Sequence, residues 1–397
     1  MYKLPLLNKL MNNMNSLAKG AGRNTFRQLK RIANSRKERD SSLKTPLEGY
    51  PPPSQDTAAA IAELSRVVKD NPEAIEIYLA LGNLYRAQGD IERAIKIRNN
   101  LIVRPHLQTR YKGRILYELG MDYKRGGFLD RAQETFQEAR QIVGDDPAII
   151  EEMASLAASD QDFEKAARYY KILSKPVAEA HYYVQLSKLL LSKEETEDSE
   201  FWLKKALSTY PASIEAWLEK MIRSYNLEKW DQLANNFKKG LTKVESNLRF
   251  ILLEGLIDHL IQNKGKEELF SPVINKIAAD KLIKTVHKQP PDILLYYYGA
   301  WLLIQLRETE NANKWLYKCR ELSPDFWPAR LESLALCSEN QPLDTEFKEH
   351  LDYFFQRARQ VKKFICSRCG LKREKIFFVC PRCRSWYSIS FLKSLTQ

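Results

Sequence analysis

Residues 81–95 read LGNLYRAQGDIERAI, and the pattern in this stretch decides the fold. Its opening Leu-Gly-x-x-Tyr motif occurs again from Leu119, and in both copies an alanine follows the glycine by twelve residues, at Ala132 in the second copy. Equivalent small residues follow at Ala166 and Ser199, so the last two steps are 34 and 33 residues. A repeat of this length, with small residues at fixed places, indicates an array of stacked helical hairpins.

Packing explains why the small residues recur. Glycine and alanine allow the two helices of a hairpin to cross closely, while large residues such as Tyr85, Tyr123 and Phe136 fill the gaps between hairpins. Prolines stop the helices near the predicted unit ends, at Pro105, Pro147, Pro211 and Pro324. This is the tetratricopeptide pattern, and it predicts an all-α solenoid.

The sequence divides into three predicted parts. Residues 1–55 form a basic arm that we expect to be partly disordered, residues 56–360 form the tetratricopeptide solenoid, and residues 361–397 form a small metal-binding domain. Within the solenoid we predict a helix at 56–71, which resembles the second helix of an earlier hairpin. A Gln-Pro-Pro-Asp segment predicts a joint between two sub-arrays near residues 286–292.

Positive charge is concentrated in the N-terminal arm. The chain has a net charge of +13, and residues 1–40 contain ten Lys or Arg against Glu38 and Asp40, which leaves +8 in this arm. Such an arm is expected to adhere to an anionic membrane surface. No stretch approaches the roughly 20 apolar residues that a transmembrane helix needs, so we expect no membrane-spanning segment.

Four cysteines near the C-terminal end predict a metal site. They form two Cys-x-x-Cys pairs separated by ten residues: Cys366 with Cys369, and Cys380 with Cys383. Two residues between the thiolates allow one tight turn to direct both sulfurs at one point, and the neighbouring Gly370 favours metal knuckles over buried core cysteines, with disulfides or incidental thiols as the alternative. We predict zinc, which is redox-silent and holds small modules together, with iron as the alternative.

The residues around these knuckles predict a small β module. Residues 375–379 and 385–391 are rich in β-prone side chains, and we expect their aromatic and aliphatic groups to cluster around the metal cage. The two remaining cysteines, Cys319 and Cys337, are predicted to be buried small apolar residues.

No motif for catalysis stands out. The five histidines are scattered and none forms a His-Glu-x-x-His pair, and the sequence has no phosphate-binding loop, dinucleotide fingerprint or nucleophile elbow. We therefore predict a protein without enzymatic activity.

The first helix of each hairpin is expected to line a groove. The inward-facing positions of two consecutive hairpins are basic with apolar spots, which suits an acidic or amphipathic peptide. The predicted partner-binding residues are Asn83, Arg86, Arg114, Tyr117, Lys124 and Arg125.

Two other functions remain open from the residues alone. The C-terminal module is basic and contains aromatic residues, a combination that suits single-stranded nucleic acid. Iron in the cysteine cage would instead make the module an electron carrier.

The combination of repeats and cysteine tail resembles the lipopolysaccharide assembly protein B family over roughly residues 56–392. The matching text is residues 81–95, residues 130–132 and residues 380–386, the last reading CPRCRSW. The resemblance implies a rubredoxin-like tail whose metal ligands are the four cysteines. It also implies a non-enzymatic adaptor at the cytoplasmic face of the bacterial inner membrane.

The family's role gives the expected partners. Members help a membrane-bound AAA+ protease to degrade the deacetylase that commits carbon to lipid A, and both the repeats and the tail are needed. The family begins with one transmembrane helix, and this chain departs from that pattern because its first residues form only the basic arm.

Overall fold

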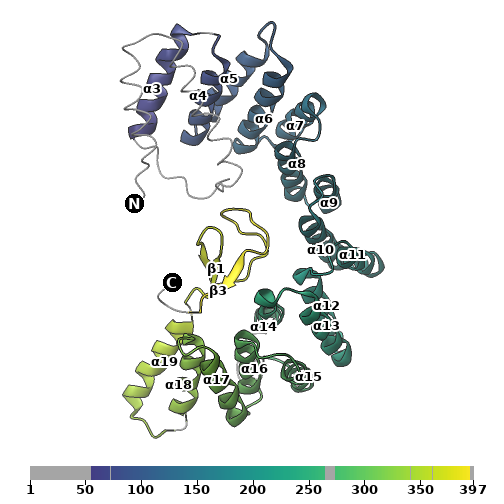
Figure 1. The fold of residues 1–397 in the computed structure, drawn as a ribbon, viewed down its shortest axis with the longest axis vertical. Helices are drawn as coiled ribbons and strands as arrows, with labels where there is room; N and C mark the ends of the chain where they lie inside the picture. The colour runs from purple at the N-terminus through teal and green to yellow at the C-terminus, as the bar shows by residue number, and fades with distance from the viewer. Residues whose placement is uncertain (1–54, 72, 264–272, 340, 360, 394–397) are drawn as a thin grey trace. The chain divides into compact units, whose positions relative to one another are not determined.

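The computed structural model describes residues 55–71, 73–263, 273–339, 341–359 and 361–393 (Figure 1). The chain falls into two compact units, Met1–Lys175 and Pro176–Gln397. Apart from Gln55, the basic arm lies outside the described residues, so its predicted disorder and membrane contact stay predictions.

The first unit is built from helical hairpins. Helix α4 packs against α5, α6 against α7, and α8 against α9, while α3 packs against α4 as the remaining helix of an earlier hairpin. This confirms the predicted repeat and the helix expected at residues 56–71. The bounds are α3 Gln55–Asp70, α4 Ile75–Gln88, α5 Ile91–Ile102, α6 Thr109–Arg125, α7 Leu129–Val143, α8 Pro147–Ser159 and α9 Phe163–Ile172.

The second unit continues the hairpins and ends in a small sheet. Helix α10 packs against α11, α12 against α13, α16 against α17, and α18 against α19. Between them, α14 contacts α12 and α16, and α15 contacts α13 and α16. The bounds are α10 Pro176–Ser192, α11 Thr196–Thr209, α12 Ile214–Asn226, α13 Trp230–Lys243, the 3-10 helix η1 Ser246–Leu248, α14 Phe250–Asn263, α15 Lys276–His287, α16 Ile293–Gln305, α17 Thr309–Leu322, α18 Trp327–Glu339 and α19 Thr345–Arg359.

The joint expected near residues 286–292 lies inside the second unit. Helices α15 and α16, on either side of it, pack against each other. Asp292 caps α16 by accepting hydrogen bonds from the backbone N–H groups of Leu294 and Leu295, both at 2.9 Å. The prolines therefore end one helix and lead into the cap of the next, while the boundary between the compact units falls after Lys175.

Hairpin turns in both units hold one residue in the left-handed conformation. Gly89 and Gly127 adopt it with φ of 93° and 81°, and Gln161, Glu194 and Glu228 adopt it at the same place in later turns with φ of 61°, 66° and 55°. Glycine takes this conformation without a steric penalty, whereas other residues are strained there. The later turns thus keep the same backbone conformation although they have no glycine at this position.

Close helix crossings account for the glycine in the repeat motif. A Cβ atom placed on Gly120 would lie 2.7 Å from the Phe136 ring of the partner helix. The equivalent atom on Gly299 would lie 2.0 Å from the Trp315 ring. Both distances are shorter than any relaxed carbon contact, so these two crossings need glycine.

The C-terminal sheet is small and antiparallel (Figure 1). Its strands are β1 Phe364–Cys366, β2 Lys372–Arg373 and β3 Ile389–Phe391, in the order β2-β1-β3. Residues 375–379, which we expected to form a strand, contribute only one bridge, between Val379 and Trp386. The second knuckle follows at once, and its turn leaves no room for a longer ladder.

Within the described ranges, no helix is both long enough and apolar enough to cross a membrane.

Candidate metal centre

The two cysteine pairs lie in turns that share one backbone geometry. In the first turn the N–H of Gly370 donates to the carbonyl of Cys366 at 2.9 Å, and in the second the N–H of Arg384 donates to the carbonyl of Cys380 at 2.8 Å. Gly370 and Arg384 both have positive φ, at 72° and 54°. The chain therefore folds twice into the same knuckle, and each knuckle presents two sulfurs.

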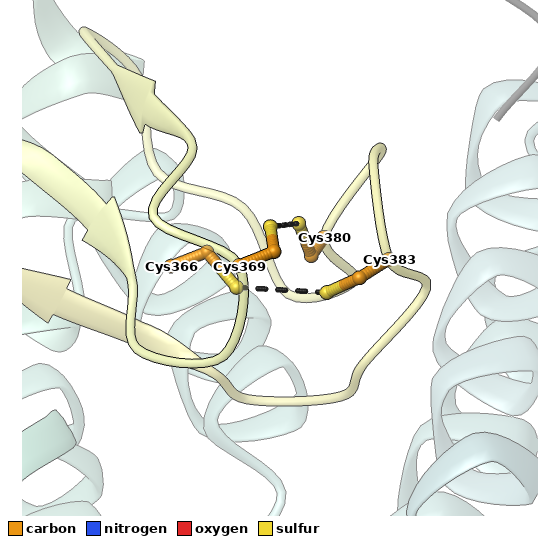
Figure 2. Close-up of side chains that lie close together, drawn as sticks. All are labelled: Cys366, Cys369, Cys380 and Cys383. Atoms are coloured by element: carbon orange, nitrogen blue, oxygen red, sulfur yellow. Dashed lines mark hydrogen bonds between the residues drawn. The ribbon is translucent and has the colours of Figure 1, made fainter. Parts of the chain in front are cut away.

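The four sulfurs converge on one point (Figure 2). The Sγ atoms of Cys366 and Cys383 are 3.7 Å apart, those of Cys369 and Cys380 are 3.6 Å apart, and all four lie within 4.8 Å of one another. A disulfide would need about 2.05 Å. A tetrahedral ion with metal–sulfur bonds of about 2.3 Å has sulfur–sulfur edges of about 3.8 Å. The spacing therefore fits a single tetrahedral ion, and the four cysteines could bind one.

Two serine hydroxyls lie against the sulfurs. The Oγ atom of Ser388 is 3.2 Å from the sulfur of Cys366, that of Ser385 is 2.9 Å from the sulfur of Cys383, and the two hydroxyls are 2.8 Å apart. Burial raises the pKa of the Cys366 thiol, but hydrogen bonds, the strongest from Ser388, outweigh it and lower that pKa to about 6. The pKa of Cys383 is also lowered, since several hydrogen bonds, the strongest from Ser385, together outweigh burial. Burial raises the pKa of Cys369 and of Cys380. The two hydroxyls thus favour the thiolate form at Cys366 and Cys383, which is the form that binds a metal.

The sheet is anchored in an aromatic cluster contributed by the helices. Phe364 of β1 and Phe391 of β3 lie 5.8 Å apart by ring centroid, and each lies about as close to Phe250 of α14, at 6.0 and 5.9 Å. Phe391 also contacts Tyr297 of α16 and Phe326, at 6.3 and 5.8 Å. Each pair at such distances stabilises by about 0.5–1.5 kcal/mol beyond its buried area.

A second anchor follows the last cysteine. The Trp386 ring lies 5.0 Å from the ring of His181 and 6.4 Å from that of Tyr182, both on α10. His181 in turn contacts the buried carboxylate of Glu215 on α12 at 2.7 Å. Tyr387 lies 6.2 Å from Tyr210. The second knuckle is therefore held against α10 and the end of α11.

Polar contacts close the attachment near α18. The indole N–H of Trp327 donates to the carbonyl of Leu392 at 3.2 Å, and the N–H of Leu392 donates to the carbonyl of Lys363 at 2.7 Å. The ammonium of Lys363 lies 3.5 Å from the carboxylate of Glu254, whose pKa burial raises although Lys363 opposes this.

The apolar residues of the module do not all cluster around the cage as expected. Phe364, Phe377, Ile389 and Phe391 belong to one continuous core that runs through helices α12 to α18. Ile376 packs on the same core. It lies beside Gly255 of α14, close to Leu218 of α12, and a Cβ atom placed on Gly255 would be 3.2 Å from the Ile376 side chain. Thirty-odd residues cannot bury these rings by themselves, so the rings pack against the helices instead.

Basic side chains of the module remain on its surface. Lys362, Arg368, Lys372, Arg373, Lys375 and Arg382 are exposed. The aromatic side chains, by contrast, are buried or half-buried against the helices. Base stacking needs accessible rings, so the surface offers single-stranded nucleic acid positive charge without stacking platforms.

The predicted groove residues lie in the first unit, where most of them join consecutive first helices. Arg86 of α4 makes ion pairs with Glu118 and Asp122 of α6, at 2.7 and 2.8 Å, and a hydrogen bond to Asn83 at 3.1 Å. Lys124 of α6 pairs with Glu152 of α8 at 2.8 Å.

The other three predicted residues are arranged less uniformly. Arg114 pairs with Glu76 at 3.2 Å and stays exposed, the Tyr117 ring lies 5.9 Å from that of Phe136, and Arg125 is half-buried. A partner-binding role for the six residues stays a prediction, and any partner would meet side chains already held in place.

Sequence reasoning missed the centre of this ion-pair network. Arg98 of α5 is fully buried, with Nε 3.4 Å from Asp122, and its guanidinium donates to the carbonyl of Leu79 at 3.0 Å. A Cβ on Gly82 would lie 2.6 Å from this guanidinium. The glycine of the first repeat motif thus makes room for a buried charge rather than for an aromatic ring.

The two cysteines outside the cage differ. Cys319 is fully buried, and burial raises the pKa of its thiol to about 12. The prediction for Cys337 was wrong, because Cys337 is exposed. On α18 the buried face is formed by neighbours such as Ala335 and Leu336, and Cys337 lies off that face.

The fold and the cysteine cluster define a tetratricopeptide repeat protein with a C-terminal four-cysteine module. Tetratricopeptide repeat family models match residues 54–112 and residues 180–213.

The chain is similar to proteins named lipopolysaccharide assembly protein B. It is 22% identical over 341 residues to the protein of that name from Escherichia coli K12, which covers 83% of this chain and 84% of the relative. It is also 22% identical to the protein of the same name from Haemophilus influenzae, over 79% of this chain and 78% of the relative. Among solved structures, a tetratricopeptide repeat protein from Parabacteroides merdae is 18% identical over 75% of this chain and 99% of that chain, with a TM-score of 0.31.

Proposed function

We propose that this protein is an adaptor in lipopolysaccharide assembly that presents the deacetylase of lipid A synthesis to a membrane-bound AAA+ protease. The observation that carries the proposal is the four-cysteine module packed into the core of a tetratricopeptide unit, in a chain similar to lipopolysaccharide assembly protein B over most of its length. Tetratricopeptide arrays act through protein–protein contacts, which is what an adaptor requires.

The cage supports a structural ion rather than a reactive one, and we propose zinc. Four thiolates close a tetrahedral site and leave no coordination position for a substrate. The cage residues Cys366 and Cys380 lie in the core of the second unit, where a redox-silent ion would stabilise the fold. Elemental analysis of purified protein tests this, because one zinc per chain is expected and one iron, which colours an S4 site red, would contradict it.

The adaptor proposal implies no catalysis by this chain. Within the described ranges, the four cysteines form the cluster of potential metal ligands, and an ion bound by all four thiolates would have no open coordination position for a substrate. The chain would then act by holding two proteins close together, which raises the effective concentration of one for the other.

A reconstituted degradation assay tests the adaptor role. Purified protease and deacetylase are mixed with the wild-type chain or with the Cys380→Ser variant, and loss of the deacetylase is followed with time. We expect the wild type to speed degradation and Cys380→Ser to fail. Cys337→Ser is the matched control, since Cys337 lies outside the cage. Equal degradation with and without the wild-type chain would contradict the proposal.

Attachment to the cytoplasmic face of the inner membrane is a separate part of the proposal. The +8 charge of residues 1–40 supports it, since each Lys or Arg near an anionic surface contributes about 1 kcal/mol. Flotation with anionic and with neutral liposomes, using the full chain and a chain lacking residues 1–40, measures this directly. Recovery with anionic liposomes that does not depend on residues 1–40 would rule out the arm as the anchor.

A further inference from the structure

A cavity of about 420 Å³ lies in the second unit beside the attachment of the module. Its walls come from helices α14, α16 and α18, together with Arg359 at the end of α19 and Lys363 before β1. The volume is within the range of ligand pockets in proteins, roughly 300–1,000 Å³.

The walls of the cavity are mainly aromatic and aliphatic. Trp301 and Trp327 contribute indole rings, and aliphatic side chains complete the surface: Ile257, Ile261, Ile304 and Leu331. Indole faces attract cations, and aliphatic walls suit the methylene stem of a long side chain.

The charges that line the cavity do not cancel. Three carboxylates face two cations. Glu332 accepts two hydrogen bonds from Arg359, at 3.0 and 2.7 Å, and Glu254 lies 3.5 Å from Lys363. Asp258 has no cation within ion-pair distance among the described residues. One negative charge is therefore left over in a chain whose net charge is +13.

A buried hydroxyl on the same wall is incompletely satisfied. The Tyr298 side chain is 2% exposed, and its hydroxyl interacts with the Glu254 carboxylate without completing a hydrogen bond of good geometry among the described residues. It lies near Glu254, whose negative charge adds to burial in raising the pKa of this hydroxyl. A buried hydroxyl also has a lone pair that can accept a hydrogen bond, so an incompletely satisfied hydroxyl on a cavity wall can accept one from a ligand.

We propose that this cavity binds a lysine or arginine side chain from an extended segment of a partner protein. The ammonium or guanidinium would pair with Asp258 and donate to the Tyr298 hydroxyl, while its stem packs between Trp301 and Trp327. A cation is favoured over an anion because Arg359 and Lys363 are already paired, whereas Asp258 is not. The inference does not depend on the proposed role in lipopolysaccharide assembly.

The test uses the full chain labelled with 5-fluorotryptophan and short peptides as probes. The chain has seven tryptophans, and the resonances of Trp301 and Trp327 are assigned from their Trp→Phe variants. The probes are Ac-Ala-Leu-Lys-Leu-Ala-NH2 and its analogues with glutamine or glutamate in place of lysine. We expect a saturable shift of the Trp301 resonance by the lysine peptide, with a dissociation constant of about 1 mM or below, and about tenfold weaker binding of the glutamine peptide.

Three variants make the result specific. Asp258→Asn should weaken binding of the lysine peptide about tenfold, and Asp258→Glu should retain binding because the charge is kept. Asp280→Asn, at a half-buried position of α15 outside the cavity, is the matched control and should have no effect. The other tryptophan resonances report whether each variant is folded.

Several outcomes would overturn the inference. One is the absence of saturable shifts at Trp301 with any of the peptides. Equal or tighter binding of the glutamate peptide would show that Arg359 and Lys363 select an anion. Equal weakening by Asp258→Asn and Asp280→Asn would show that binding depends on the overall surface charge and not on Asp258. Loss of binding in a folded Asp258→Glu variant would show that the negative charge at this position does not account for binding.

Discussion

The first helices of the hairpins are used differently in the two units. In the first unit they are joined by charges, since Arg86 of α4 binds carboxylates of α6 and Lys124 of α6 binds a carboxylate of α8. In the second unit Lys188 of α10 also pairs with Glu219 of α12, at 3.5 Å, but the first helices there carry in addition aromatic and aliphatic surface that the C-terminal module covers, at α10, α12, α14 and α16. The same repeat thus supports two arrangements of its first helices. In one they contact only neighbouring helices, and in the other they also pack against the C-terminal module.

Removal of one metal ligand should produce the largest difference in stability between the two units. In Cys380→Ser the cage loses one of four ligands, and binding of a structural zinc contributes roughly 10–16 kcal/mol of apparent folding energy in small modules. We expect hydrogen exchange to rise throughout the module and in α14 and α16, while α4 to α8 keep their protection. Cys337→Ser is the control, and equal protection of the module in both variants would contradict the prediction.

The converse experiment destabilises the first unit. Asp122→Ala leaves Arg86 and the fully buried Arg98 without a carboxylate that lies 2.8 and 3.4 Å away. Removing one partner of a buried ion pair costs about 3–5 kcal/mol. Urea unfolding and local hydrogen exchange should show the loss in α4 to α6 alone. Asp130→Ala, at an exposed site on α7, should cost less than about 1 kcal/mol; a similar loss there would argue against the network.

A smaller effect is expected at the second anchor of the module. Trp386→Ala removes the ring that contacts His181 and Tyr182, at a cost of about 2 kcal/mol for a half-buried aromatic residue. Exchange should rise around the second knuckle and in α10. Trp202→Ala, on α11 and beside Tyr183, should destabilise α10 and α11 without loosening the knuckle. A loose knuckle in both variants would show that the anchor is not local.

The hydroxyls beside the sulfurs should change the metal affinity of the cage without being required for metal binding. Ser388→Ala removes the hydroxyl 3.2 Å from Cys366 and should weaken metal retention about tenfold, as is usual for groups that support a ligand. Competition with a chromogenic chelator measures this. Ser390→Ala, two residues further along and in β3, is the control. Unchanged retention in Ser388→Ala would mean that backbone N–H groups alone set the thiolates.

The smallest expected effects have opposite signs in the two knuckles. Gly370 and Arg384 occupy equivalent left-handed positions, so Gly370→Ala should destabilise the module and Arg384→Gly should stabilise it, each by about 1 kcal/mol. Thermal unfolding of the metal-bound protein gives both values. The same sign for both changes would show that the knuckles are not equivalent.

The sequence was sufficient to predict the hairpins and the meeting of the four sulfurs. Both depend on short-range spacing: the distance from Gly120 to Ala132 is set within one hairpin, and that from Cys366 to Cys369 within one turn. The place where the module attaches could not be predicted. Phe391 and Phe250 are far apart in sequence, and composition alone did not distinguish a core inside the module from a core shared with helices.

The ion-pair network of the first unit likewise could not be predicted from the sequence. Periodicity placed Arg86 and Lys124 on the inner face of their helices, but it did not reveal that carboxylates of the next hairpin lie within 3 Å of them. That match depends on the rotation between successive hairpins. A basic position in a repeat therefore reads as a free binding residue until the neighbouring helix is known.

The order of synthesis gives the aromatic anchor a further consequence. Phe364 and Phe391 complete a core whose other rings, such as Phe250 and Tyr297, leave the ribosome more than sixty residues earlier than Phe391. Helices α14 and α16 therefore carry apolar surface that stays uncovered until β3 is made. A product that stops before residue 361 would keep that surface open to chaperones and proteases.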